Sequence, residues 1–531
     1  MAAVVLTAVL AVVTWPYATV LGSGIPNHAD PMFGVWRLSW FAHAIPAHLS
    51  IADTNIFYPE RGTFAFSDSI FLLDGFAAPL LWAGANKVLV YNLLLGAGVI
   101  GSGLALFLAA RTIDIPSPCA IVAAVIFTVA PYRIEHLMHL ELQWLAGAVA
   151  AIASTALIAR RPSPLAMLAL AASMVVQFLT SIYYAVFLVP LLGVVWIACI
   201  PLMPNPWRTL RLTIAAGTLA GTLVTPIALL HVRQGERLGG RSLHDVEQFS
   251  ATPADYLATP DENLLYGRPT SDAGYAERRL FPGTVASALA VAGLFSRRRR
   301  LTITAVVFIA LAFEFSLGLN GTIYPYLYRW LPAWRGFRAA ARYGAYVLLG
   351  VSTLAALGCE VLLVRLKLAG RNAATVVLAS TLVVALCVEY VSPQHLVRVV
   401  GGTPPVYAML NMLPSGVVLE YPTPSDDSAP EIDADYAFWS TTHWRPLING
   451  YSGYSPPSFL ERAARLQRFP SDDTLAELRA LHVRYVIVHP WAIRQPRRAS
   501  VLERLALRRD VKYLGPFPDW RESAELFELS R

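Results

Sequence analysis

The N-terminal stretch of the chain, residues 3–31, reads AVVLTAVLAVVTWPYATVLGSGIPNHADP. Residues 3–24 are almost wholly apolar, and a helix needs ~20 such residues to cross a membrane. No Lys or Arg precedes this run, as a secretory signal would require, so we expect an uncleaved first helix that Pro16 kinks. Asp30 follows where that helix should leave the membrane. An acidic residue at this place indicates a site at the membrane surface.

The composition of the whole chain is typical of a membrane protein. Of its 531 residues, 56% are hydrophobic and 15% are charged, whereas soluble domains are about 25% charged. Backbone polar groups must be paired within hydrocarbon, so the spanning segments should be helices. The net charge of +7 lies largely in short loops and indicates no nucleic-acid partner. We expect about eleven transmembrane helices, near residues 3–24, 78–110 (its first part at the interface), 118–133, 142–159, 164–181, 184–203, 211–231, 282–296, 301–319, 341–364 and 373–391.

Basic residues occur in alternate loops between these spans. Cytoplasmic loops are enriched in Lys and Arg, so this alternation predicts the sidedness of the chain in the cytoplasmic membrane. The loops at 25–77, 134–141, 232–281 and 320–340, the turn near Ser181 and the tail from 392 should be extracytoplasmic. The loops expected in the cytoplasm carry Arg111; Arg160 and Arg161; Arg208 and Arg211; Arg297 to Arg300; and Arg365, Lys367 and Arg371.

The tail of the chain differs in character from the rest. Strand patterns occur at 416–421 and 483–488, and helical patterns occur at 472–482 and 502–508. Short strands are also expected at 511–514 and 525–529. The sequence therefore predicts a transmembrane domain over 1–391 and a small extracytoplasmic α/β domain over 392–531, a usual size for one domain.

Charged side chains are frequent in the first outer loop. Asp30 lies at the edge of a span, where the low dielectric should raise the pKa of its carboxylate. A single carboxylate there could accept a proton from an acceptor hydroxyl as a general base. Asp53, further along the loop, is a candidate contact for acceptor or sugar. The alternative for both residues is a solvated loop with incidental charges.

A second group of polar residues lies in the short connection after the third span. His136 and His139 are three residues apart and Glu135 and His139 are four apart, so each pair shares a face if the segment is helical. Together with Glu141, these side chains could hold a divalent metal or a phosphate. The alternative is an interfacial helix cap, and no established metal motif is present.

Arginines and tyrosines form a third group. Arg338 and Arg342 lie outside on the expected topology, against the usual charge bias, and Arg is suited to bidentate phosphate binding. The alternative for the arginines is pairing with carboxylates of the outer loops. Tyr183 and Tyr184 lie at the outer end of the fifth expected span, as part of an aromatic belt or as contacts to a sugar.

With these features the chain resembles the GT-C superfamily of integral-membrane glycosyltransferases, in a bacterial branch of mostly uncharacterised proteins. The shared plan is an acidic residue after the first helix, a polar site between the third and fourth helices, and a soluble C-terminal domain. The stretches that carry the resemblance are 28–30, 55–59, 131–141, 181–184, 338–343 and 392–531.

The resemblance implies a polyprenyl-phosphate-linked sugar donor and an inverting transfer to a glycan, lipid or protein acceptor. Asp30 matches the catalytic acidic position. Relatives that use a metal often have a D-x-D pair, whereas this chain has His28-Ala29-Asp30, and His28 could replace a carboxylate ligand. A divalent metal is therefore a possible cofactor with ligands drawn from His28, Asp30, His139 and Glu141, although the lack of a second carboxylate favours metal-free phosphate binding.

The resemblance also implies the roles of the other polar groups. Glu135, His136, His139 and Glu141, with His28, would position the donor phosphate, and Arg338 or Arg342 would stabilise the departing lipid phosphate. Two other classes of function are considered. A flippase or transporter of lipid-linked sugars should carry charged groups at mid-membrane in broken helices, and here the exceptions are Glu314, Glu360 and Glu389. A non-catalytic membrane scaffold leaves the outer Asp, His and Arg residues unexplained.

Overall fold

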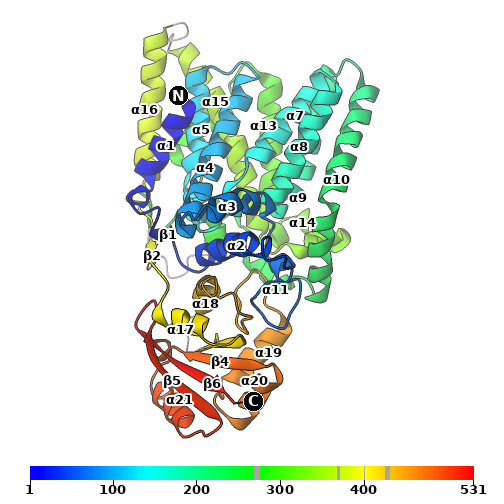
Figure 1. Cartoon of the computed structure of the whole chain (residues 1–531). Coiled ribbons are helices and arrows are strands. Elements are labelled where there is room, and N and C mark those ends of the chain that lie inside the picture. Colours follow the sequence, from blue (N-terminus) through cyan, green and yellow to red (C-terminus); the bar gives the residue numbers. More distant parts are fainter. Residues whose placement is uncertain (268–275, 367–370, 400, 425–430, 531) are drawn as a thin grey trace.

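The computed structural model describes residues 1–531 except 268–275, 367–370, 400, 425–430 and 531. Most of the chain forms a bundle of long helices, and a domain with a small β-sheet lies at one end of that bundle (Figure 1). This architecture confirms the expected class, a polytopic helical membrane protein with a C-terminal α/β domain. The helices of the bundle are α1 (Ala2–Val13), α3 (Phe71–Trp82), α4 (Lys87–Arg111), α5 (Ser117–Val129), α7 (Ala146–Arg160), α8 (Pro164–Thr180), α9 (Ile182–Cys199), α10 (Pro206–Arg237), α12 (Thr284–Gly293), α13 (Arg299–Ser316), α15 (Gly344–Arg365) and α16 (Asn372–Tyr390).

The number of full-length spans is smaller than the expected eleven. In the described residues, seven segments are long and apolar enough to cross a membrane. The other expected spans are shorter helices, apart from α13, which carries Arg299, Arg300 and Glu314 within its 18 residues. The seven segments are Lys87–Arg111, Ser117–Met138, Glu141–Arg160, Ile182–Leu202, Pro206–Arg237, Ala340–Arg365 and Asn372–Tyr390.

The first two expected spans have different boundaries in the structure. Helix α1 ends at Val13, before Pro16, so its 12 residues extend only ~18 Å. Proline has no amide proton and disrupts a helix interior, and here the helix ends where only a kink was expected. The expected span 78–110 divides into α3 and α4, and the side chain of Asn86 caps α4 by accepting from the amides of Val88 and Leu89.

The described basic connections gather at the end of the bundle opposite the sheet domain (Figure 1), and Lys367 lies outside the described residues. The Arg298 guanidinium pairs with Glu360 at 3.0 Å and donates to the carbonyls of Ile113 and Asp114. These contacts join the α4–α5 loop, the α12–α13 loop and the end of α15. The alternation of charge therefore corresponds to one end of the molecule, and its side of the membrane stays a prediction.

The C-terminal domain contains a four-stranded sheet with the strand order β3-β4-β6-β5. Strands β3 (Val417–Tyr421) and β4 (Val483–Val488) are parallel, and β6 (Ser523–Leu529) pairs antiparallel with β4 and with β5 (Val511–Pro518). All four strands lie where the sequence patterns predict them. The helices of this part are α17 (Pro405–Met412), α18 (Ile432–Ser440), α19 (Pro457–Leu466), α20 (Asp472–Ala480) and α21 (Arg497–Ala506).

The loop at 25–77 is joined to the C-terminal domain through its backbone. The amides of Phe57 and Tyr58 donate to the carbonyls of Asn449 and Leu447 at 2.8 and 2.9 Å. Phe57 is fully buried, and the segment 55–59 packs against the tail. Strand β1 (Gly24–Pro26) also pairs with β2 (Leu396–Arg398). These contacts fix the position of the Asp30 segment.

Candidate functional site

Asp30 is the first residue of α2 (Asp30–Ala44), a helix that runs across the end of the bundle (Figure 1). Its carboxylate lies 3.1 Å from Nε2 of His139 and accepts a hydrogen bond of 2.8 Å from the hydroxyl of Tyr451. Just before Asp30, Asn27 and Ala29 have positive φ angles of 68° and 60°. Such strained backbone conformations cluster at functional sites. The chain therefore holds Asp30 in a defined orientation.

The environment of Asp30 keeps its carboxylate ionised. Burial by itself would raise the pKa, but the hydrogen bonds from His139 and Tyr451 and the charge of Arg338 outweigh burial and lower it. The expectation that a low dielectric raises this pKa was wrong, because the sequence does not reveal these donors. At 36% exposure the side chain also remains reachable, and it lines a cavity formed by α2, the loop before α3 and the polar turn at 138–141.

His28 faces the C-terminal domain. Its Nε2 lies 3.0 Å from Asp435 and its Nδ1 lies 3.4 Å from Glu431. Hydrogen bonds to Asp435 and Glu431 raise the pKa of His28 to about 10, against the opposing effect of burial. The positive charge of His28 is therefore balanced by two carboxylates of the tail, and its ring nitrogens are engaged by them.

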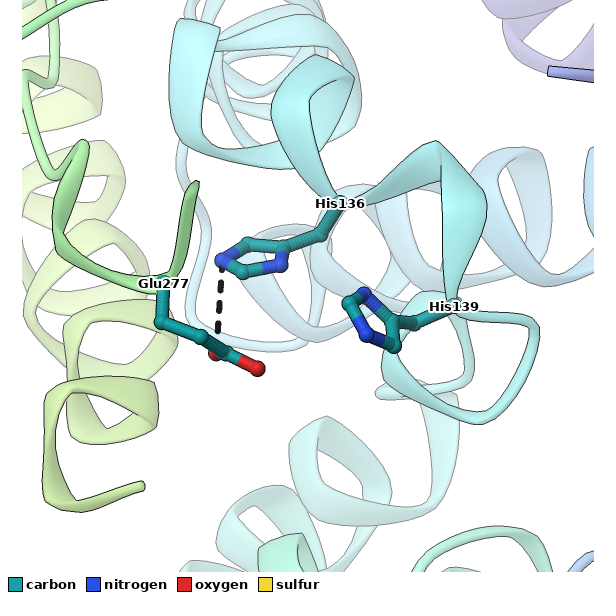
Figure 2. Close-up of side chains that lie close together, drawn as sticks. All are labelled: His136, His139 and Glu277. Carbon is teal, nitrogen blue, oxygen red and sulfur yellow. Dashed lines mark ion pairs between the residues drawn. The ribbon is translucent and has the colours of Figure 1, made fainter. Parts of the chain in front are cut away.

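The polar turn after α5 brings its two histidines together. Helix α6 (Pro131–Glu135) ends at Glu135, the short 3₁₀ turn η3 (His136–Met138) follows, and His139 comes directly after that turn in an extended conformation. The ring centroids of His136 and His139 are 5.6 Å apart (Figure 2). Glu135 does not join them, because its carboxylate pairs with Arg279 at 2.8 Å.

The two candidate arginines have different partners. Arg342 is buried and binds both carboxylate oxygens of Glu277 through Nε, at 3.1 and 3.0 Å. Its guanidinium also lies over the ring of Tyr183, 4.6 Å from the centroid. Arg338 forms no ion pair with any residue that the structure describes, lies over Phe249, and is close enough to Asp30 to affect its pKa. Arg338 is thus a cation available to an anionic ligand near Asp30.

The remaining predicted site residues divide between the cavity and other places. Glu141 lines the cavity with Asp30 and His139. Asp53 is bound within its own loop, where it pairs with Arg61 at 3.2 Å and accepts from the Gly62 amide. Tyr184 is buried, and its hydroxyl lies 3.3 Å from that of Tyr132, whereas the Tyr183 hydroxyl accepts from the Arg338 amide.

Three residues of the site were not predicted from the sequence. Tyr451 binds Asp30 across 421 positions of the chain. Glu277 binds Arg342 and lies 3.9 Å from Nε2 of His136. Arg37 follows Asp30 by about two turns on the same face of α2. It lines the cavity and is almost fully buried. None occurs in a local motif, and only the spacing of Arg37 from Asp30 on one helix offered a signal.

Comparison with known proteins gives fold-level relatives. No family model and no curated sequence matches the chain. The structure is similar to that of the arabinofuranosyltransferase AftD from Mycobacteria, with a TM-score of 0.68 and 14% identity over 100% of this chain and 40% of that one. It is also similar to ArnT from Cupriavidus metallidurans in the apo state, with a TM-score of 0.50 and 13% identity over 99% of this chain and 97% of that one.

These similarities are low in sequence identity and cover only part of AftD. The chain spans about 40% of the length of AftD, and identities of 13 and 14% establish the arrangement of the chain alone. AftD and ArnT are both GT-C membrane glycosyltransferases. The resemblance found in the sequence is thereby confirmed at the level of structure: this multi-pass membrane protein has the GT-C fold.

Proposed function

We propose that the chain is a membrane glycosyltransferase that moves a sugar from a polyprenyl-phosphate-linked donor to a hydroxyl or amine of a glycan, lipid or protein acceptor. The reaction takes place at the extracytoplasmic face of the cytoplasmic membrane. The observation that carries the proposal is the position of Asp30: an ionised, partly exposed carboxylate at a cavity, held by His139 and Tyr451. The GT-C fold supports the same class of reaction.

The proposed chemistry is a direct displacement. Asp30 accepts the proton of the acceptor while the acceptor oxygen or nitrogen attacks the anomeric carbon. The bond between that carbon and the phosphate oxygen breaks, the phosphate leaves with the electron pair, and attack on the opposite face inverts the anomeric configuration. The base form that this step requires is the form that the surroundings of Asp30 favour.

Arg338 is the residue that we assign to the leaving phosphate. Negative charge develops on the phosphate oxygen as the bond breaks, and a prepositioned cation stabilises it. Arg342 is already bound by Glu277, so its role is to orient Glu277 and Tyr183 around the site. Arg338 has no such carboxylate partner among the described residues and can meet the donor without losing an existing ion pair.

The acidic residues that could favour a transporter have local structural partners. Glu389 accepts from the amides of Thr284 and Val285 and so caps α12. Glu360 pairs with Arg298. Glu314 accepts from the amide of Ile323 at 2.9 Å. These contacts support an enzyme over a transporter, since each carboxylate stabilises a helix end or a loop.

The test compares two Asp→Asn variants in purified protein. Asp30→Asn keeps the size of the side chain but removes the base, so transfer from a panel of polyprenyl-phosphate sugars should fall ~10²–10⁴-fold. Asp53→Asn is the matched control, because Asp53 is also a carboxylate of the first outer loop but is bound to Arg61 away from the cavity. Near-normal turnover by Asp30→Asn would remove Asp30 from the mechanism.

A further inference from the structure

Two histidines and one glutamate converge in the structure (Figure 2), and one of them, His139, contacts Asp30. One nitrogen of His136, one nitrogen of His139 and one carboxylate oxygen of Glu277 lie within 4.8 Å of one another. In the part of the chain that the structure describes, this is the one such group of potential metal ligands. Glu277 comes from η7 (Ala276–Arg278), so the group joins two separate outer loops.

His136 lacks the partners that a buried imidazole normally has. Its side chain is 1% exposed, and neither ring nitrogen has a hydrogen-bond partner among the described residues. Nε2 lies 3.9 Å from Oε2 of Glu277, which is too long for a hydrogen bond. An unpaired buried polar group costs ~1–3 kcal/mol, so these nitrogens indicate a binding group rather than a packing residue.

His139 is oriented as a metal ligand usually is. Its Nε2 lies 3.1 Å from Asp30, and its Nδ1 is buried without a hydrogen-bond partner in the described structure. Metal-ligating histidines commonly donate their other ring N–H to a carboxylate, which fixes the tautomer and leaves a lone pair on the ligating nitrogen. Asp30 supplies that carboxylate here.

We propose that His136, His139 and Glu277 bind a divalent cation of the zinc type and leave a fourth position open. Two imidazoles and one carboxylate form the donor set of open zinc sites, whereas Mg²⁺ and Ca²⁺ prefer oxygen ligands. Ligand atoms around tetrahedral zinc are ~3.3 Å apart. Nε2 of His136 and Oε2 of Glu277 are 3.9 Å apart, and no two ligand atoms of the group are more than 4.8 Å apart. Rotation of the side chains would bring these atoms to the zinc spacing. Glu277 also supplies the carboxylate that the first-loop sequence lacks.

The charges around this group allow a divalent ion. Asp30 faces the positive charge of Arg338, and Glu277 faces that of Arg342, while Glu141 and Arg133 add one charge of each sign nearby. A bound cation with two charges therefore makes the site positive. Arg342 and a metal can share Glu277, because a carboxylate offers about four lone-pair directions. The open position then attracts an anion. On the function proposed above, and resting on it, that anion is the donor phosphate.

Metal binding can be measured without any sugar donor. Wild-type protein is treated with chelator, loaded with Zn²⁺ or Mg²⁺, desalted and analysed for metal. We expect one zinc per chain and no retained magnesium, and we expect His136→Ala to lose the zinc. His443→Ala, which alters a histidine of the C-terminal domain outside the group, should keep it. Wild-type protein without stoichiometric zinc, or His136→Ala with undiminished zinc, would overturn the proposal.

A second variant covers the case in which His136→Ala does not fold. His136→Cys keeps a ligand at the position, and its Co²⁺ complex should show a thiolate-to-cobalt charge-transfer band in the near ultraviolet. Wild type and His443→Cys with Co²⁺ should lack that band, and its absence in His136→Cys would contradict direct ligation. Because no donor is present, a loss of the proposed transferase activity leaves this result untouched, so the two proposals fail separately.

Discussion

The ion pair between His28 and the tail allows a quantitative test of how the segment that carries Asp30 is held. His28→Gln removes the charge that faces Asp435 and Glu431 but keeps a polar side chain. Since those carboxylates raise the pKa of His28 from 6.5 to about 10, the upper limit of the stabilisation is about 5 kcal/mol at ~1.36 kcal/mol per pKa unit. Glu431 is 56% exposed and screened by solvent, so the Asp435 contact should dominate.

The expected coupling between His28 and Asp435 is therefore ~1.5–3 kcal/mol, the range for a hydrogen bond to a charged group. It is measured as a double-mutant cycle of His28→Gln and Asp435→Asn, using the free energy of unfolding in detergent micelles. The control is His48→Gln, which alters an exposed histidine in the loop after α2. A coupling energy below ~0.5 kcal/mol at pH 7 would refute the assigned ion pair.

The pH dependence of this coupling has a definite sign. A group whose pKa is raised in the folded state contributes its full stability below its unfolded pKa and loses it as the pH rises through the folded value. For His28 the coupling should be complete below about pH 6.5, decrease progressively above it, and be lost above a pH of about 10. A coupling energy that is equal at pH 6 and pH 10.5 would contradict the assignment.

Three further predictions follow from the site and the topology. Arg338→Lys keeps the charge but loses the bidentate fork, so binding of a polyprenyl-phosphate analogue should weaken roughly 10–100-fold. The control Arg329→Lys, which alters an exposed arginine, should bind the analogue like wild type. Equal affinities of Arg338→Lys and wild type would remove Arg338 from the phosphate site. Tyr451→Phe removes a donor to Asp30 and should lower the transfer rate at saturating donor about tenfold, with an unchanged rate counting against this contact. Arg509→Cys should react with an impermeant thiol reagent in intact cells and Arg161→Cys only after lysis, and the reverse pattern would invert the topology.

Three residues that the sequence names lie together in the structure. Asp30 comes from the first loop, and His139 and Glu141 come from the connection after the third expected span, yet all three line one cavity. Asp53 was named from the same loop as Asp30, yet it is bound to Arg61. Acidic residues of one loop look alike in a sequence, and only the path of the loop decides which of them reaches the cavity.

The sequence by itself determined the class of the protein, because apolar length and loop charge are local properties of the chain. The same holds for the strands of the tail, whose β-branched and aromatic residues are readable within runs of five to eight residues. The tertiary structure alone decided the partners of the charges. Tyr451 meets Asp30, Glu277 meets Arg342 and His136, and Asp435 meets His28 only when distant segments pack together. Hydrogen bonds and ion pairs act over a few ångströms of space irrespective of separation along the chain, so the ionisation of Asp30 and the environment of the histidine pair could not be deduced before the fold was known.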